Sequence, residues 1–238
     1  VHLYISDDGS VDDTINILNE HYGNNSLVTI SKNQFNGGSA GLNFISSIRS
    51  VDVRGYEYIA YCDQDDIWNL QKLSIAVESM EKTHCHGYSS AVLAFWPDGY
   101  EKLLSQSISI RKADFLFEGA GQGCTFVIRV EGFKKLQDFC KKNYALIVNF
   151  HFHDWLTYLL FRVWGFKWFF DQQISLRYRQ HSSNDIGARK GFSGIFKRIS
   201  LIRSGWYRKQ LILAMSIYEA AGGKDDKIIN FIDKFNSR

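Results

Sequence analysis

The sequence has little of several features that mark specialised protein classes. Its four cysteines form no CxxC pair and are widely spaced, so reduced packing thiols of a cytosolic protein fit better than a disulfide framework. It has a single proline, and no Pro-rich linker, internal repeat or low-complexity segment divides the chain. No apolar run approaches the roughly 20 residues that a membrane-spanning helix needs.

An excess of charge of one sign is also lacking. The formal net charge is +3, too small to indicate a nucleic-acid partner by itself, and we predict none. At 238 residues the chain is long enough to bury a substantial core. It opens at Val1 on a strand-like run with no initiator Met, so we expect a preceding piece of the protein.

Strand-like and helix-like segments alternate along the first half of the chain. This alternation predicts an α/β domain with a mainly parallel sheet, in which ligands bind at the carboxyl ends of strands. Ser39 is a plausible N-cap and Gly23 a plausible helix stop. The predicted strands are 1–6, 27–32 and 56–63, and the predicted helices are 12–23, 39–50 and 69–82.

The second half has a different pattern, which makes the sheet mixed. After residue 187 the chain becomes a basic helical tail, so we divide it into a domain at 1–187 and a tail at 188–238. The predicted strands here are 90–96, 166–171 and 174–180, and the predicted helices are 131–143 and 151–165.

Two acidic clusters directly follow predicted strands. In DDGSVDD, residues 7–13, Asp12 and Asp13 suit a helix N-terminus, whereas Asp7 and Asp8 at the strand end can accept hydrogen bonds from a base or a ribose. In DQDD, residues 63–66, crowded carboxylates are costly unless something compensates them. Either this is a solvated turn, or it binds Mg²⁺ or Mn²⁺ together with substrate phosphates.

Two other site types are excluded by their spacing. An EF-hand loop needs Gly at its sixth position, where this chain has Trp68. The glycines of GAGQGC, residues 119–124, precede a predicted strand, whereas a dinucleotide-binding loop follows one.

Taken in order, these motifs resemble one enzyme family. YISDDGSVDDT, AYCDQDDIW, QKL, GAGQGCTF, HDWL and LRYRQHSSN together are similar to the inverting, nucleotide-sugar-dependent glycosyltransferases of family 2, especially bacterial O-antigen enzymes and rhamnosyltransferases. The resemblance covers about residues 1–187. It implies a GT-A-like fold, a three-layer α/β/α sandwich with a mostly parallel mixed sheet, followed here by the helical tail. It also implies an earlier strand and helix ahead of Val1.

The resemblance assigns roles on the donor side. It implies that Asp8 contacts the nucleobase, with Asp7 in a supporting role. Asp63 and Asp65 form the DxD pair, with Asp65 the direct metal ligand and Asp63 nearer the ribose. His181 reaches the metal or the diphosphate, although such a His can equally be a packing residue. An Arg, for which we choose Arg179, steadies the leaving group.

It also assigns the catalytic base and the acceptor side. Asp154 of HDWL takes the place of the base that deprotonates the acceptor hydroxyl, while capping preference alone favours a simple N-cap. The apolar surroundings of Phe152 and Trp155 are expected to raise its pKa. Gly123 and Trp155 are placed beside the acceptor.

The predicted function is therefore transfer of a sugar from dTDP-rhamnose or a UDP-hexose to a saccharide or lipid-linked saccharide, with inversion and with Mg²⁺ or Mn²⁺. The alternatives are a sugar nucleotidyltransferase and a noncatalytic carbohydrate- or membrane-binding module. Basic and aromatic residues over 189–209 fit either a packed helix or peripheral contact with anionic lipid. We expect a cytoplasmic protein, at the inner face of a bacterial membrane if that contact forms.

Overall fold

The computed structural model describes residues 1–33, 38–105, 110–181 and 203–236. The strands are β1 (Leu3–Asp7), β2 (Val28–Lys32), β3 (Tyr58–Ala60), β4 (Ile67–Trp68), β5 (Gly87–Phe95), β6 (Glu101–Leu104), β7 (Val127–Arg129) and β8 (Trp168–Arg179). The helices are α1 (Thr14–Tyr22), α2 (Ala40–Ser50), α3 (Lys72–Thr83), α4 (Val130–Lys142), α5 (Tyr144–Ile147), α6 (His153–Val163), α8 (Trp206–Ala220) and α9 (Asp226–Asn236). Two 3-10 helices, η1 (Asp114–Leu116) and η2 (Gly123–Thr125), lie between β6 and β7.

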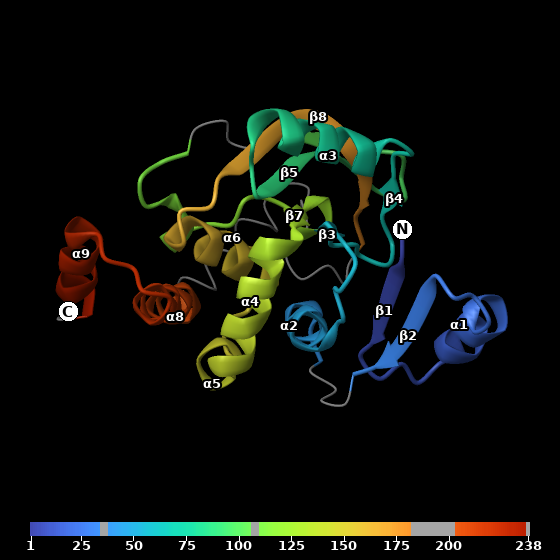
Figure 1. Ribbon diagram of the computed structural model, residues 1–238, viewed down its shortest axis with the longest axis horizontal. Coiled ribbons are helices and arrows are strands. Elements are labelled where there is room, and N and C mark those ends of the chain that lie inside the picture. Colours follow the sequence, from blue (N-terminus) through green and yellow to red (C-terminus); the bar gives the residue numbers. More distant parts are fainter. Residues whose placement is uncertain (34–37, 106–109, 182–202, 237–238) are drawn as a thin grey trace.

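A six-stranded sheet lies between two layers of helices (Figure 1). On one face, Met80 of α3 packs against Tyr88 of the sheet. On the other face, α2, α4 and α6 contribute Ile48, Leu136 and Leu159 to the main hydrophobic core. The predicted α/β fold with three layers is confirmed.

The sheet is mixed, as predicted, but it is not mostly parallel. β5 and β8 pair in parallel, whereas the β3–β7, β5–β7, β5–β6 and β4–β8 pairings are antiparallel. The prediction extended the strand–helix alternation of the first half to the second. There, β5 and β6 are joined by a short turn at 96–100, and a turn of that length can only connect antiparallel strands.

The two short strands predicted at 166–171 and 174–180 are one continuous strand, β8. Its register with β5 shifts between Ser90 and Ala91 and again between Ala91 and Val92. Such a bulge interrupts the alternation of side chains along the strand, which explains the prediction of two strands. The unbroken β8 carries the chain from the end of α6 to the acidic loop 62–66 beside β4.

The strands β1 and β2 form a separate parallel pair, joined through α1. The side chain of Asn43 on α2 holds this pair in place, because its Nδ2 donates to the Ser6 carbonyl at 2.9 Å and its Oδ1 accepts from Ser6 Oγ at 2.6 Å. Ser39 caps α2 as predicted, accepting from the Leu42 amide at 3.3 Å. Gly23 follows α1, also as predicted.

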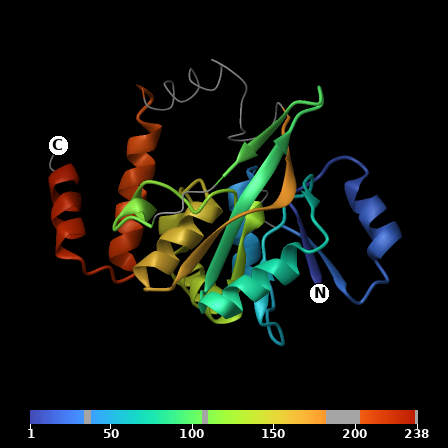
Figure 2. The same cartoon turned by 90° about the horizontal axis from the view of Figure 1, so that it is seen from above.

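The C-terminal helices α8 and α9 lie at the opposite end of the molecule from α1 (Figures 1 and 2). Met215 and Tyr218 of α8 belong to the same hydrophobic core as α6. The predicted boundary at 187 and most of the predicted membrane-contact segment 189–209 lie outside the described residues. Within the described part of the chain, every helix is too short or too polar to cross a membrane.

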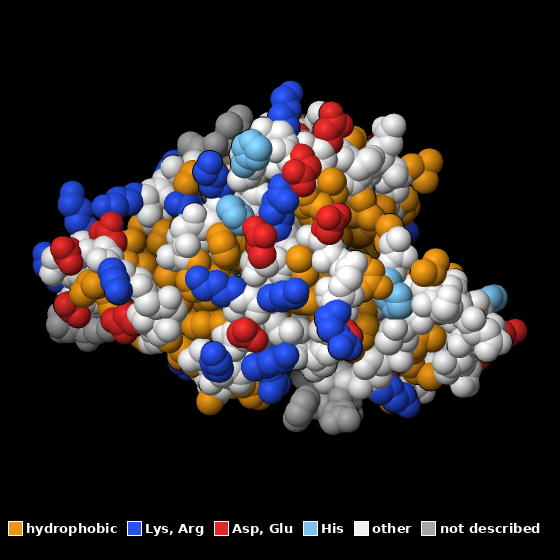
Figure 3. Space-filling view, in the orientation of Figure 1, with side chains coloured by type: hydrophobic (Ala, Val, Ile, Leu, Met, Phe, Trp, Pro, Cys, Tyr) orange, Lys and Arg blue, Asp and Glu red, His pale blue; other side chains and the backbone are white. Residues whose placement is uncertain are grey.

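The outer side of α4 is strongly charged, as its amphipathic sequence predicts. In Figure 3, Lys and Arg side chains gather over this part of the molecule with single acids among them. The helix turns Phe133 and Leu136 into the core. Its exposed basic residues are Lys134, Lys135, Lys141 and Lys142.

Candidate active site

The acidic loop 62–66 connects β3 to β4. Asp63, Asp66 and Cys124 of η2 each place one ligand atom within 4.8 Å of the others. Burial, followed by repulsion from Asp66, Asp154 and Asp65, raises the pKa of Asp63 to about 7. Burial also raises the pKa of Asp66. The loop therefore holds more negative charge than its surroundings compensate.

The end of β8 contributes Arg179 to this loop, and His181 follows the strand. The Arg179 amide donates to Asp66 Oδ1 at 3.0 Å, and Arg179 Nε donates to the Asp65 carbonyl at 2.8 Å. His181 Nε2 lies 3.0 Å from Asp65 Oδ2. The antiparallel pairing of β4 with β8 fixes these contacts. The structure thus brings Asp65 into contact with Arg179 and His181, which lie more than a hundred residues further along the chain.

Asp154 lies in the first turn of α6. Phe152, and not Asp154, is the N-cap of this helix, so the simple-cap alternative is wrong. The Asp154 carboxylate accepts from the Trp155 amide at 2.7 Å. Burial raises its pKa to about 6, against the opposing effect of backbone hydrogen bonds from Trp155 and Gly123. The predicted rise in pKa is therefore found, and Asp154 is near the range that suits a general base.

Gly123 makes a close approach to the start of α6. A Cβ at this position would lie 2.8 Å from His153 Nε2 and 3.0 Å from Asp154 Cβ, so a larger residue would displace the helix start. Trp155, by contrast, is 5% exposed, and its Nε1 donates to the Phe115 carbonyl at 2.8 Å. Gly123 lies directly beside Asp154, whereas Trp155 supports the helix from the core.

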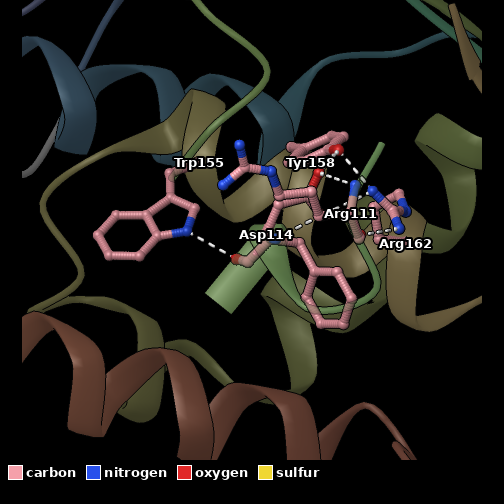
Figure 4. Close-up of polar contacts among 6 residues, drawn as sticks. Arg111, Asp114, Trp155, Tyr158 and Arg162 are labelled. Carbon is pink, nitrogen blue, oxygen red and sulfur yellow. Dashed lines mark hydrogen bonds and ion pairs between the residues drawn. The ribbon is translucent and has the colours of Figure 1, made fainter. Parts of the chain in front are cut away.

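A buried ion pair fastens α6 to η1 (Figure 4). Arg162 Nη1 donates to Asp114 Oδ1 at 2.8 Å, and the Tyr158 hydroxyl donates to Asp114 Oδ2 at 3.0 Å. Arg162 Nη2 also donates to the Arg111 carbonyl at 3.1 Å. Because Trp155 bonds to the same segment, three positions on one side of α6 hold the helix that carries Asp154.

The loop before α6 is held by α8. Gln210 is 5% exposed, and its Oε1 accepts from the His151 amide at 2.9 Å while its Nε2 donates to the Asn149 carbonyl at 3.1 Å. A Cβ on Gly41 of α2 would lie 2.1 Å from the His151 carbonyl oxygen, so α2 closes on the same loop from its other side. The entry to α6 is thus fixed by helices from both halves of the chain.

His153, to which the sequence assigned no role, is a packing residue. Its ring stacks on Phe44 with centroids 3.8 Å apart and lies 5.5 Å from the ring of Tyr61. Burial lowers its pKa to about 3, so the imidazole is neutral at ordinary pH. Phe44 follows Asn43 on α2, so this helix connects the β1–β2 pair to the start of α6.

The strand end at Asp7 and Asp8 is ordered by its own turn. The Asp7 carboxylate accepts from the Gly9 and Ser10 amides and from the Ser10 hydroxyl, whose hydrogen bond is the main cause of its lowered pKa. Asp8 accepts from Asn33 Nδ2 at 2.7 Å and from the Gly38 amide at 2.8 Å. Asp7 therefore shapes the turn, which agrees with a supporting role, and the less buried Asp8 lies at the ends of β1 and β2.

The donor atoms around the acidic loop suit a hard divalent cation. Mg²⁺ and Mn²⁺ prefer oxygen ligands, which Asp63, Asp65 and Asp66 offer. Asp66 Oδ2 is buried, and the Cys124 thiol is the side chain whose hydrogen bonding lowers the pKa of this carboxyl against the effect of burial. Burial holds the pKa of Cys124 well above its usual value, so this thiol stays protonated and is a poor ligand.

Comparison with known proteins identifies the family. Residues 1–137 match the family model described as glycosyl transferase family 2. The chain belongs to this family. Over 214 residues it is 37% identical to the dTDP-rhamnosyl transferase RfbG of Shigella flexneri, covering 89% of this chain and 73% of that protein. The predicted family 2 glycosyltransferase resembling rhamnosyltransferases is confirmed.

Solved structures confirm the fold. S. aureus TarS 1–349 in complex with UDP matches with a TM-score of 0.57 at 13% identity, covering 100% of this chain. The complex of the same protein with UDP-GlcNAc matches with a TM-score of 0.56 at 13% identity, covering 98% of this chain. The chain spans 62% of the length of each of these structures. The predicted GT-A-like fold is therefore confirmed for this family 2 member.

Three features of the site were missed from the sequence. Cysteines were interpreted as packing residues, yet Cys62 is exposed and Cys124 lies among the carboxylates. Lys72 lies near the start of the predicted helix 69–82, where a lysine is expected at the surface, and it is buried. The stacking of Phe44 on His153 had no signal in the sequence, because the two residues are far apart along the chain and belong to different helices.

Proposed function

We propose that this chain transfers a sugar from a nucleoside diphosphate donor to a saccharide hydroxyl with inversion, in a metal-dependent reaction, and that Asp154 is its base. The observation that carries the proposal is the position of Asp154 beside Gly123 and within electrostatic reach of Asp63. On this proposal, a base and a donor-binding loop act in one site. The 37% identity to a dTDP-rhamnosyl transferase supports dTDP-rhamnose as the donor.

The reaction that fits these residues is a single displacement. The acceptor oxygen attacks the anomeric carbon while Asp154 takes its proton, and the bond from that carbon to the diphosphate oxygen breaks. The diphosphate departs with the bond's electron pair, so negative charge grows on it. A divalent cation held by Asp63 and Asp65 would stabilise that charge. Arg179 and His181, at the same edge of the loop, are placed to support the diphosphate.

Two observations support the proposed acceptor side, namely the resemblance of the HDWL motif and the contact between Gly123 and Asp154. A saccharide, free or linked to a lipid, would approach Asp154 past Gly123. Peripheral contact of segment 189–209 with anionic lipid would bring the enzyme to a lipid-linked acceptor.

Activity is expected to fall as the pH drops through about 6. The raised pKa means that Asp154 loses its basic form below that pH, whereas an ordinary Asp at 3.8 would keep it. Measuring kcat/KM between about pH 4.5 and 8, at saturating metal, should give an acidic limb with unit slope. A limb that begins only near pH 4 would contradict the assignment of Asp154 as base.

Nucleotide binding is expected to require both Asp65 and a divalent cation. Calorimetric titration of dTDP and UDP with Mn²⁺ should give binding that disappears with EDTA and weakens by about 100-fold or more in Asp65→Ala, because the metal loses a carboxylate ligand. Asp138→Ala, on the exposed side of α4, is the control. Equal binding with EDTA would show the metal proposal to be wrong. Stronger binding of UDP than of dTDP would replace thymine by uracil as the proposed nucleobase of the donor.

A further inference from the structure

Lys72, at the start of α3, is an unusual side chain. Lys72 is 1% exposed, and among the described residues it is the one Lys or Arg that is buried. Its Nζ has no hydrogen-bond partner and lies 3.5 Å from the centroid of the Trp68 ring. A buried ammonium without compensation is costly, so its position needs a source of negative charge.

The acidic loop supplies that charge. Asp63 and Asp66 both lie within electrostatic reach of Lys72, although neither forms a direct ion pair with it among the described contacts. Asp66 Oδ2 is likewise buried. Attraction between the Lys72 ammonium and these carboxylates is substantial because little water screens buried charges. The contact with the electron-rich face of Trp68 holds the ammonium in place.

We propose that Lys72 is an internal counter-ion of the acidic loop. Its ammonium stabilises Asp63 and Asp66 when no divalent cation is bound, and it weakens the affinity of the loop for that cation. The cation then binds firmly only when the donor diphosphate adds its own negative charge. The second part rests on the proposed metal-dependent function, whereas the first part does not.

The first part is tested by stability in EDTA. Lys72→Met keeps an unbranched apolar chain against Trp68 but removes the charge, so the carboxylates lose their compensation, and we expect the melting temperature to fall by several degrees. Lys82→Met, on the exposed side of the same helix, is the control and should not change it. An unchanged or higher melting temperature for Lys72→Met would overturn the proposal.

A double variant separates charge from packing. If Lys72 acts through charge, adding Asp66→Asn to Lys72→Met should recover most of the lost stability, because fewer uncompensated carboxylates remain. If the loss comes from packing, Asp66→Asn will not recover it, and the counter-ion assignment is wrong. This comparison remains informative even if the single variant is too unstable to purify in quantity, since the double variant should then be recovered.

The second part is tested with Mn²⁺ alone. Titration followed by electron paramagnetic resonance, without nucleotide, should show Lys72→Met binding Mn²⁺ about 10-fold more tightly than the unmodified chain and than Lys82→Met. Equal affinities would overturn the competition between lysine and metal. If none of the three proteins binds Mn²⁺ without nucleotide but Lys72→Met is destabilised in EDTA, the counter-ion role stands and the competition between lysine and metal is overturned. The metal dependence of the proposed function is then decided separately, by the titration of dTDP and UDP with Mn²⁺ and with EDTA.

Discussion

Asp154→Asn is expected to lower turnover by about 10³-fold while leaving the affinity for the donor nucleotide unchanged. Loss of a positioned general base typically costs 10²–10⁴-fold, and we expect a loss in the middle of this range because the pKa of Asp154 is close to one that suits proton transfer. The amide keeps the size of the side chain and can still accept from the Trp155 amide. Turnover should be measured under single-turnover conditions, and donor binding by calorimetry.

The matched control is Asp138→Asn, which makes the same chemical change on the exposed side of α4. It should leave turnover unchanged. An Asp154→Asn variant with nearly full activity would remove the base assignment and show that another group takes the proton of the acceptor hydroxyl. A variant that loses donor binding as well would place Asp154 on the donor side of the reaction.

Arg162→Met is expected to be the most destabilising of the substitutions considered. It leaves Asp114 buried without its cation, and breaking a buried pair in this way costs about 3–5 kcal/mol. For a chain of this size the melting temperature should fall by roughly 10 °C. Because Asp114 also receives the Tyr158 hydroxyl, η1 and α6 should loosen together. Thermal unfolding followed by circular dichroism measures the change.

An exposed ion pair on the same chain provides the comparison. Arg54 and Asp52 are 2.6 Å apart, closer than the buried pair, but their side chains are 88% and 58% exposed. Arg54→Met should therefore change stability by less than about 1 kcal/mol. The double variant Asp114→Asn with Arg162→Met should be less destabilised than Arg162→Met alone, because no unpaired charge remains. Similar losses for Arg54→Met and Arg162→Met would mean that burial does not govern the strength of these pairs.

Much of the fold followed from local patterns in the sequence. Apolar periodicity placed α3 and α4 within a few residues of their observed bounds. Ser39 marked a helix start because its side-chain oxygen can accept from the first turn, and Gly23 marked a helix end because glycine disfavours helix continuation. Strand direction did not follow, because it depends on which strands meet and not on the residues within each one. β5 shows this, since it pairs in parallel with β8 and antiparallel with β6.

The residues of the candidate site also differ in how clearly the sequence signals them. The carboxylates of DQDD were singled out because charge at the end of an apolar segment stands out in a sequence. Asp154 was singled out only by the family resemblance, which also assigned the roles. Lys72 was missed because a lysine three residues into a predicted amphipathic helix start normally faces solvent. Its burial is produced by β4, a strand of two residues that brings Trp68 over it and that no periodicity could reveal.

The hydrogen bonds from α8 to the loop before Asp154 matter for the design of chimaeric proteins that join parts of two family members. The part of the chain that matches the family model ends at residue 137, yet Gln210 bonds to both ends of the turn that leads into α6. A chimaera joined near residue 187 would thus combine α6 of one parent, which carries Asp154, with position 210 of the other parent. Parents that differ at position 210 should give hybrids in which the start of α6 is displaced while the β1–β2 pair is unchanged, so crossovers should keep 149 to 210 together as one inherited block.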